Sequence, residues 1–91
     1  MNKVITVGWK NRGDNIVDKN GEIITVESII KGPRGRIWEI EIVDKEIGTI
    51  GLYNEISFGI TCTHYVNAEC MVNYEVLKDG HEIIYGKKKE V

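Results

Sequence analysis

Apolar and polar residues alternate along most of this chain, a pattern that predicts short β-strands. The clearest case lies near the middle, where Trp38, Ile40 and Ile42 share one face and Glu39 and Glu41 share the other. A strand of this kind buries one side and exposes the other, as strands of antiparallel sheets commonly do. We therefore expect the face with Trp38 to lie against the core and the two glutamates to keep the other face in water.

The same spacing predicts strands at residues 4–9, 36–43, 49–53 and 56–66. Two hairpins are also expected, because an Asn-Gly or Asp-Gly pair between two apolar runs is a strong signal for a tight turn. The first covers residues 16–26 around Asn20-Gly21, and the second covers residues 76–85 around Asp79-Gly80.

Residues 68–77 fit two structures. Cys70, Val72, Tyr74 and Val76 fall at strand spacing, whereas Cys70, Tyr74 and Leu77 fall at helical spacing. Because an apolar run with an Asp-Gly turn follows directly, we favour a strand here. A short helix near residues 68–77 is the alternative.

Together these elements predict an all-β fold, a small antiparallel and partly open barrel or sandwich of about seven to eight short strands, of the SH3-like or OB-like kind. The apolar composition agrees, because isoleucine recurs throughout while leucine occurs only at Leu52 and Leu77, and β-branched residues suit strands. We expect one β domain over residues 1–86, followed by a basic C-terminal tail at residues 87–91.

The net charge is −2, so the molecule as a whole does not attract phosphate backbones or anionic membranes. No apolar run approaches the roughly 20 residues that cross a bilayer, and the first residues lack the apolar stretch of a signal peptide. The sequence therefore predicts a cytoplasmic protein without a membrane partner.

Nucleic-acid binding would need a local basic patch with an aromatic ring, in which guanidinium groups meet phosphates and the ring stacks on a base. Two loops offer such residues: Trp9, Lys10, Arg12, Lys31, Arg34 and Arg36. The chain also resembles, over less than half of its length, small β DNA-binding modules fused to phage homing endonucleases, and no residue role is carried over from that likeness. It rests on Gly21-Glu22, Thr25-Val26, Trp38, Gly48-Thr49, Ile56 and Gly59.

Zinc accepts the residue types present at Cys62, His64, Cys70 and His81. The paired Cys-x2-Cys ligands of most structural zinc sites are absent, so the two cysteines are expected to be core residues. Phosphate loops, dinucleotide fingerprints and His-Glu-x-x-His motifs are also absent. We expect no metal, no cofactor and no catalytic residue.

These exclusions favour a non-enzymatic binding module that acts through protein–protein contacts, of the kind found among phage or mobile-element accessory and inhibitor proteins. Aromatic side chains dominate interface hot spots, so the candidate anchors are Trp9, Tyr53, Phe58 and Tyr65. The alternative is a nucleic-acid-binding small β-barrel that uses the basic and aromatic loops. The sequence leaves the oligomeric state open.

Overall fold

The computed structural model describes residues 7–56 and 59–85. In this part of the chain five antiparallel strands form one open sheet in the order β4-β3-β2-β1-β5. The strands are β1 (Ile29–Lys31), β2 (Ile37–Asp44), β3 (Thr49–Glu55), β4 (Ile60–Asn67) and β5 (Glu75–Val76). The helical elements are the 3-10 helices η1 (Pro33–Gly35) and η2 (Ala68–Asn73) and the short α-helix α1 (Gly80–Tyr85).

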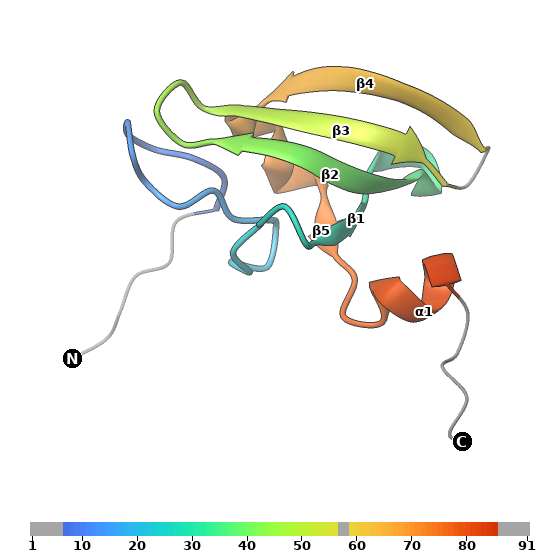
Figure 1. Cartoon of the computed structure of the whole chain (residues 1–91). Helices are drawn as coiled ribbons and strands as arrows, with labels where there is room; N and C mark the ends of the chain where they lie inside the picture. Colours follow the sequence, from blue (N-terminus) through green and yellow to red (C-terminus); the bar gives the residue numbers. More distant parts are fainter. Residues whose placement is uncertain (1–6, 57–58, 86–91) are drawn as a thin grey trace.

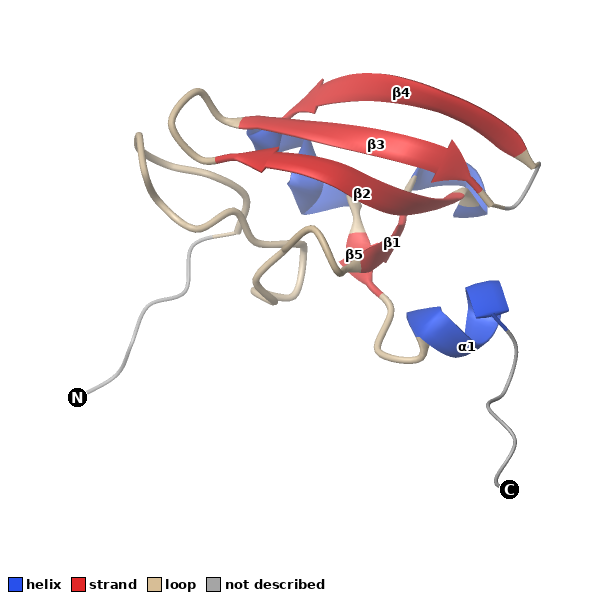
Figure 2. Ribbon diagram, in the orientation of Figure 1, coloured by secondary structure: helices blue, strands red, loops and turns tan. Residues whose placement is uncertain are grey.

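The long strands β2, β3 and β4 form one layer of the molecule, and η2, α1 and most of the connecting segments lie beneath it (Figure 1 and Figure 2). We call the side of β2, β3 and β4 that faces these elements the inner face, and the opposite side the outer face. The core lies against the inner face. It contains Ile16, Ile24, Ile30, Trp38, Ile40, Ile50, Leu52, Ala68 and Met71.

The expected mostly β, antiparallel domain is confirmed. The number of strands was overestimated, since the described residues contain five strands where seven to eight were expected. Their sheet is open, with β4 at one edge and β5 at the other, so the barrel detail of the prediction is not supported. None of the described helices is long and apolar enough to span a bilayer. The expected tail at residues 87–91 lies outside the described residues.

The three central strands were predicted well. The segments expected at 36–43 and 49–53 are β2 and β3, and the segment expected at 56–66 contains most of β4. Of the strand expected at 4–9, only residues 7–9 are described, and they form an isolated bridge between Gly8 and Val17.

The first expected hairpin keeps its turn but not its strands. Gly21 has a left-handed φ of 82° and its N–H donates to the Asp18 carbonyl at 3.1 Å. Asn20 has no positive φ among the described residues, so the turn is not the type I′ turn that Asn-Gly suggested, which needs positive φ at both positions. The two arms share one bridge, between Val17 and Ile23, and the backbone hydrogen bonds around it, from Asp18 N–H to the Glu22 carbonyl at 2.9 Å and from Ile24 N–H to the Ile16 carbonyl at 2.8 Å, and no strand forms on either side.

A buried carboxylate explains why this turn is stable without a ladder. Asp18 has no exposed surface, and its Oδ1 accepts hydrogen bonds from the backbone N–H groups of Asn20 and Glu22, both at 2.8 Å. Its Oδ2 accepts one from the N–H of Val76 in β5 at 2.7 Å. One side chain therefore closes the turn and ties it to the edge of the sheet.

The favoured strand at 68–77 was wrong for its first six residues, which form the helix η2. A 3-10 helix repeats every three residues, and Ala68 and Met71 at this spacing are both fully buried under the sheet. Cys70 is exposed, which corrects its expected place in the core. Of the predicted strand, only Glu75 and Val76 pair with the sheet, as β5. Burial raises the pKa of the neighbouring Tyr74 phenol, and Cys70 adds to the rise.

The second expected hairpin was also wrong, because the chain continues after Asp79 into α1. An Asp-Gly type I′ turn would require a positive φ at the glycine. Gly80 has no positive φ, and it is buried. A Cβ atom at Gly80 would overlap the side chain of Ile29 in β1. The glycine thus serves a close approach between α1 and β1.

Candidate interaction surface

A β-bulge determines which side chains reach the outer face. Ile40 pairs with Leu52 but Ile42 pairs with Gly51, so Glu41 is an extra residue in β2. Because a one-residue shift moves a side chain to the other face of a sheet, Ile42 leaves the inner face of Trp38 and Ile40. Its expected burial was wrong, since 36% of its surface is exposed.

An apolar cluster occupies the middle of the outer face. The register brings Ile42, Gly51 and Tyr65 side by side on β2, β3 and β4. A Cβ atom at Gly51 would lie 3.1 Å from the Ile42 Cβ and 3.4 Å from the Tyr65 Cε1, so the absence of a side chain makes room for both neighbours. Tyr53, which the sequence singled out, lies on the same face and is 38% exposed, and Tyr65 is 60% exposed.

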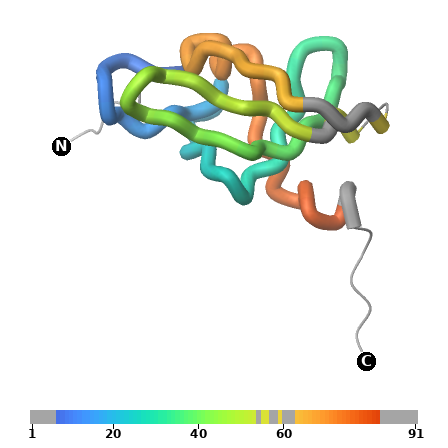
Figure 3. Tube along the Cα trace, turned by 45° about the horizontal axis from the view of Figure 1, so that its top comes forward, coloured from blue at the N-terminus to red at the C-terminus, as the bar shows by residue number. Residues whose placement is uncertain are grey.

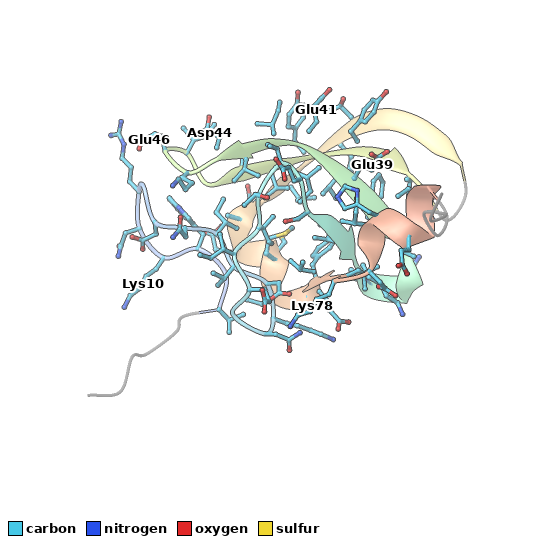
Figure 4. All side chains as sticks on the ribbon, turned by 60° about the horizontal axis from the view of Figure 1, so that its bottom comes forward. Lys10, Glu39, Glu41, Asp44, Glu46 and Lys78 are labelled. Carbon is cyan, nitrogen blue, oxygen red and sulfur yellow. The ribbon has the colours of Figure 1, made fainter. Side chains whose placement is uncertain are left out.

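Acidic side chains of β2 lie along one side of this cluster. In the pairing of β2 with β3, Glu39 lies opposite Tyr53 and Asp44 lies opposite Thr49 on the outer face. The Glu41 carboxylate reaches across β3, where its Oε2 accepts a hydrogen bond from the Thr63 Oγ1 at 3.1 Å. In Figure 4, Glu39, Glu41, Asp44 and Glu46 lie along the upper part of the molecule, and Lys10 and Lys78 lie below.

The charge of the outer face has one sign. The strands β2, β3 and β4 contain no lysine or arginine, although the chain has 12 basic residues. Of their acidic residues only Glu55 is fully buried; it pairs in register with Trp38, which belongs to the inner face. The outer face therefore combines exposed tyrosines with negative charge, and no described helix or loop covers it.

The two basic loops lie at opposite ends of β2. Gly13 donates to the carbonyl of Lys45, just after the strand, and the Arg12 guanidinium pairs with Glu46 at 2.8 Å. Arg36 directly precedes the strand. An eight-residue strand is about 26 Å long, and Figure 1 and Figure 3 show the loops at opposite ends of the molecule. Lys10 and Arg12 thus form no single patch with Lys31, Arg34 and Arg36.

Trp9 belongs to the packing below the turn between β2 and β3. It is half-buried against the core, and its ring lies over Gly48, where a Cβ atom would come within 2.8 Å of the Trp9 Cε3. A ring held in this way offers a nucleic-acid base little free face for stacking. Nucleic-acid binding stays an untested alternative. Because the two basic loops lie apart, it would have to use one of them without the other. Phe58 lies outside the described residues.

The residues considered for zinc have separate surroundings where the structure describes them. The imidazole of His64 stacks on the Trp38 indole, with ring centroids 6.0 Å apart. Cys70 lies on η2 and His81 on α1, and the side chain of Cys62 is outside the description. Among the described residues no group of three or more His, Cys, Asp or Glu side chains is arranged to hold a metal.

A shallow open depression lies between the first turn and β5. Its volume is about 400 Å³, and two of its charged side chains face each other, with Lys78 Nζ 3.7 Å from Glu22 Oε1. Among the described residues, no buried side-chain polar atom without a hydrogen-bond partner belongs to its lining. It carries less evidence of a ligand than the outer face. The residues that line it are Asn20, Glu22, Glu75, Val76, Leu77, Lys78 and Asp79.

Comparisons with protein-family models, with curated proteins and with solved structures find no match. The function therefore has to be argued from the geometry of the chain itself.

The sequence identified part of this surface. It singled out Tyr53 and Tyr65 as anchors, and it placed Glu39 and Glu41 on a wet face. It missed Ile42, whose exposure depends on the bulge at Glu41. The one signal that pointed to the bulge was Gly51, since glycine within a strand often marks a bulge or a close approach.

Proposed function

We propose that this chain is a non-enzymatic binding module that holds a partner protein on its outer face. The observation that carries the proposal is the cluster of Ile42, Tyr53 and Tyr65 at the centre of a sheet face that no described element covers. An exposed apolar patch with a polar rim is typical of protein interaction sites, and tyrosine is enriched among the residues that dominate binding energy.

The position of Tyr65 supports a role in binding over a role in folding. Its ring lies over Gly51 and beside Ile42, on the side of the sheet away from the core. Sixty per cent of its surface stays in contact with water, so its replacement removes little of the burial that stabilises the fold. A partner that covered this ring would bury a large apolar surface at small entropic cost, because tyrosine has only two side-chain torsions.

The experiment is affinity capture from a nuclease-treated lysate of the source cells, with the wild-type chain and a Tyr53→Thr, Tyr65→Thr double variant as baits. Threonine keeps the preference for strands and removes both rings. We expect the wild type to retain a stoichiometric protein partner and the double variant to retain at least about tenfold less, since hot-spot residues contribute about 2 kcal/mol or more.

The matched control is Ile23→Thr with Val26→Thr, which replaces two other exposed apolar side chains, 52% and 56% exposed, in the segment before β1. This control should capture the partner as the wild type does. The proposal is contradicted if the tyrosine double variant captures the partner as well as the wild type does. It is also contradicted if the wild-type chain recovers only nucleic acid from the same lysate without nuclease treatment.

A further inference from the structure

The strand β4 is an open edge of the sheet. In the described residues it pairs with β3 alone, whereas β2 lies between two strands. β4 runs for eight residues, and the strand at the opposite edge, β5, has only two. The long edge is therefore the one with enough free backbone to bind another strand.

The hydrogen-bond pattern identifies the residues that offer their backbone at this edge. The N–H of Ala68 donates to the carbonyl of Gly48 at 2.8 Å, in register with the pairing of β3 and β4. Along an antiparallel strand, successive residues direct their backbone groups alternately to one side and the other. Thr63, Tyr65 and Asn67 consequently point their N–H and C=O groups away from β3, to the open side.

From Thr63 to Asn67, β4 lacks the usual protection of an edge strand, because the register shift in its pairing with β3 lies before Thr63, between the pairs Glu55–Ile60 and Tyr53–Thr63. Natural edge strands carry lysine, other charges, proline or bulges that prevent pairing with other chains. Residues 60–67 contain no Asp, Glu, Lys, Arg or Pro, and several of them are the β-branched and aromatic residues that favour strands. Such an edge is suited to strand addition, a common mode of peptide recognition.

Charge selects the kind of strand that fits. On an added strand, the residue directly opposite Thr63 projects onto the outer face about 5 Å away. The Glu41 carboxylate lies on the β3 side of Thr63, bonded to the Thr63 hydroxyl, and the exposed Tyr65 ring is two residues along β4. A lysine or arginine opposite Thr63 is long enough to cross the short threonine side chain, where it would meet a carboxylate and an aromatic face together.

We propose that β4 binds an extended, basic segment of the partner protein as an additional antiparallel strand, with a lysine or arginine opposite Thr63 that pairs with Glu41 and lies against Tyr65. The proposal rests on the binding role proposed above and names the partner's chemistry. A second copy of the chain fits less well, because pairing of two β4 edges would bring two acidic outer faces together and supply no cation for Glu41.

The test is selection from a phage-displayed library of random ten-residue peptides on the wild-type chain, followed by affinity measurements with a synthetic copy of the most enriched peptide. We expect enriched peptides to carry Lys or Arg at alternate positions. Glu41→Gln should weaken the synthetic peptide about fivefold, in the range of an exposed charge and cation–π contact. Failure to enrich any peptide, or enrichment of peptides without basic residues, would overturn the proposal.

Backbone pairing is tested separately. Thr63→Pro removes an N–H that points to the open edge, whereas Thr63→Ala removes the hydroxyl and keeps the N–H. We expect the proline variant to bind at least about tenfold more weakly than the alanine variant, because ladder hydrogen bonds supply much of the affinity of an added strand. If the proline variant has an altered circular dichroism spectrum, its fold has changed. In that case the wild-type chain is tested with a peptide whose alternate backbone amides are N-methylated, and its affinity is compared with that of the unmodified peptide. Equal binding in that comparison would rule strand addition out.

The two proposals fail in distinguishable ways. Undiminished binding of the peptide and of the captured partner by the Tyr53→Thr, Tyr65→Thr variant contradicts the binding role of the outer face. If that variant loses binding, but neither Thr63→Pro nor N-methylation of the peptide weakens binding, the outer face remains the binding site and strand addition alone is overturned. A concentration-dependent dimer in sedimentation that the peptide does not dissociate would assign the edge to a second copy.

Discussion

The carboxylate of Asp18 joins two distant parts of the molecule. It bonds to two N–H groups in its own turn and to one in β5, which lies 58 residues away in the sequence. A buried donor that loses its acceptor costs about 1–3 kcal/mol. The three donors therefore make this side chain important for stability, although nothing in the alternation of apolar residues distinguished it from an exposed turn aspartate.

We predict that Asp18→Ala lowers the free energy of unfolding by about 3 kcal/mol. Asp18→Asn should cost about half as much, because its amide oxygen can still accept the two turn bonds while its NH₂ group faces the donor of Val76. Glu27→Ala makes the same charge change at an exposed position and should stay within about 0.5 kcal/mol of the wild type. Urea denaturation followed by tryptophan fluorescence measures all three, and equal stability of Asp18→Ala and Glu27→Ala would refute the assigned role.

The strands and the helices differed in how well the sequence predicted them. β2 and β3 were found because period-two alternation reports burial on one face of a strand. The two turn signals misled, because Asn-Gly and Asp-Gly also suit turns that no ladder follows. At Gly21 the buried carboxylate of Asp18 ties the turn to β5, and at Gly80 the chain packs closely against Ile29 as it enters α1. Contacts between distant segments decided both, and local pattern does not record them.

The same reasoning applies to the binding surface. The sequence named Tyr53 as a candidate anchor because it is aromatic, and its exposure became evident only from its place on the outer face of β3. Exposure of Ile42 follows from the bulge at Glu41, which inverts the alternation halfway along β2. The separation of the two basic loops follows from the length of β2 and needs the paired sheet. The sequence could name these loops but could not place them relative to each other.

The contact between α1 and β1 gives a prediction at the scale of elements. Helix propensity alone would make Gly80→Ala stabilising by about 1 kcal/mol. Because an added methyl group at Gly80 overlaps Ile29, we expect a loss of about 2 kcal/mol instead, as in other overpacked sites. Thermal unfolding followed by circular dichroism shows whether Gly80→Ala raises or lowers the melting temperature. An increase would show that α1 does not depend on this contact.

At the scale of the whole molecule, the sheet separates packing from recognition. Its inner face holds Trp38, Ile40, Ile50 and Leu52 against the core, and its outer face presents tyrosines among carboxylates. None of the lysines and arginines lies in β2, β3 or β4. This distribution favours a partner with positive charge over a nucleic acid at the outer face, since phosphate groups would meet Glu39, Glu41 and Asp44.

Amide hydrogen exchange with mass spectrometry, on the chain alone and bound to the protein it captures, tests the binding role of the outer face most directly. We predict that the partner slows exchange in residues 49–55 and 63–67, which form β3 and most of β4, and leaves residues 10–14 and 32–36 unchanged. Slower exchange confined to those two basic loops, with β3 and β4 unaffected, would contradict the outer face as the site of binding.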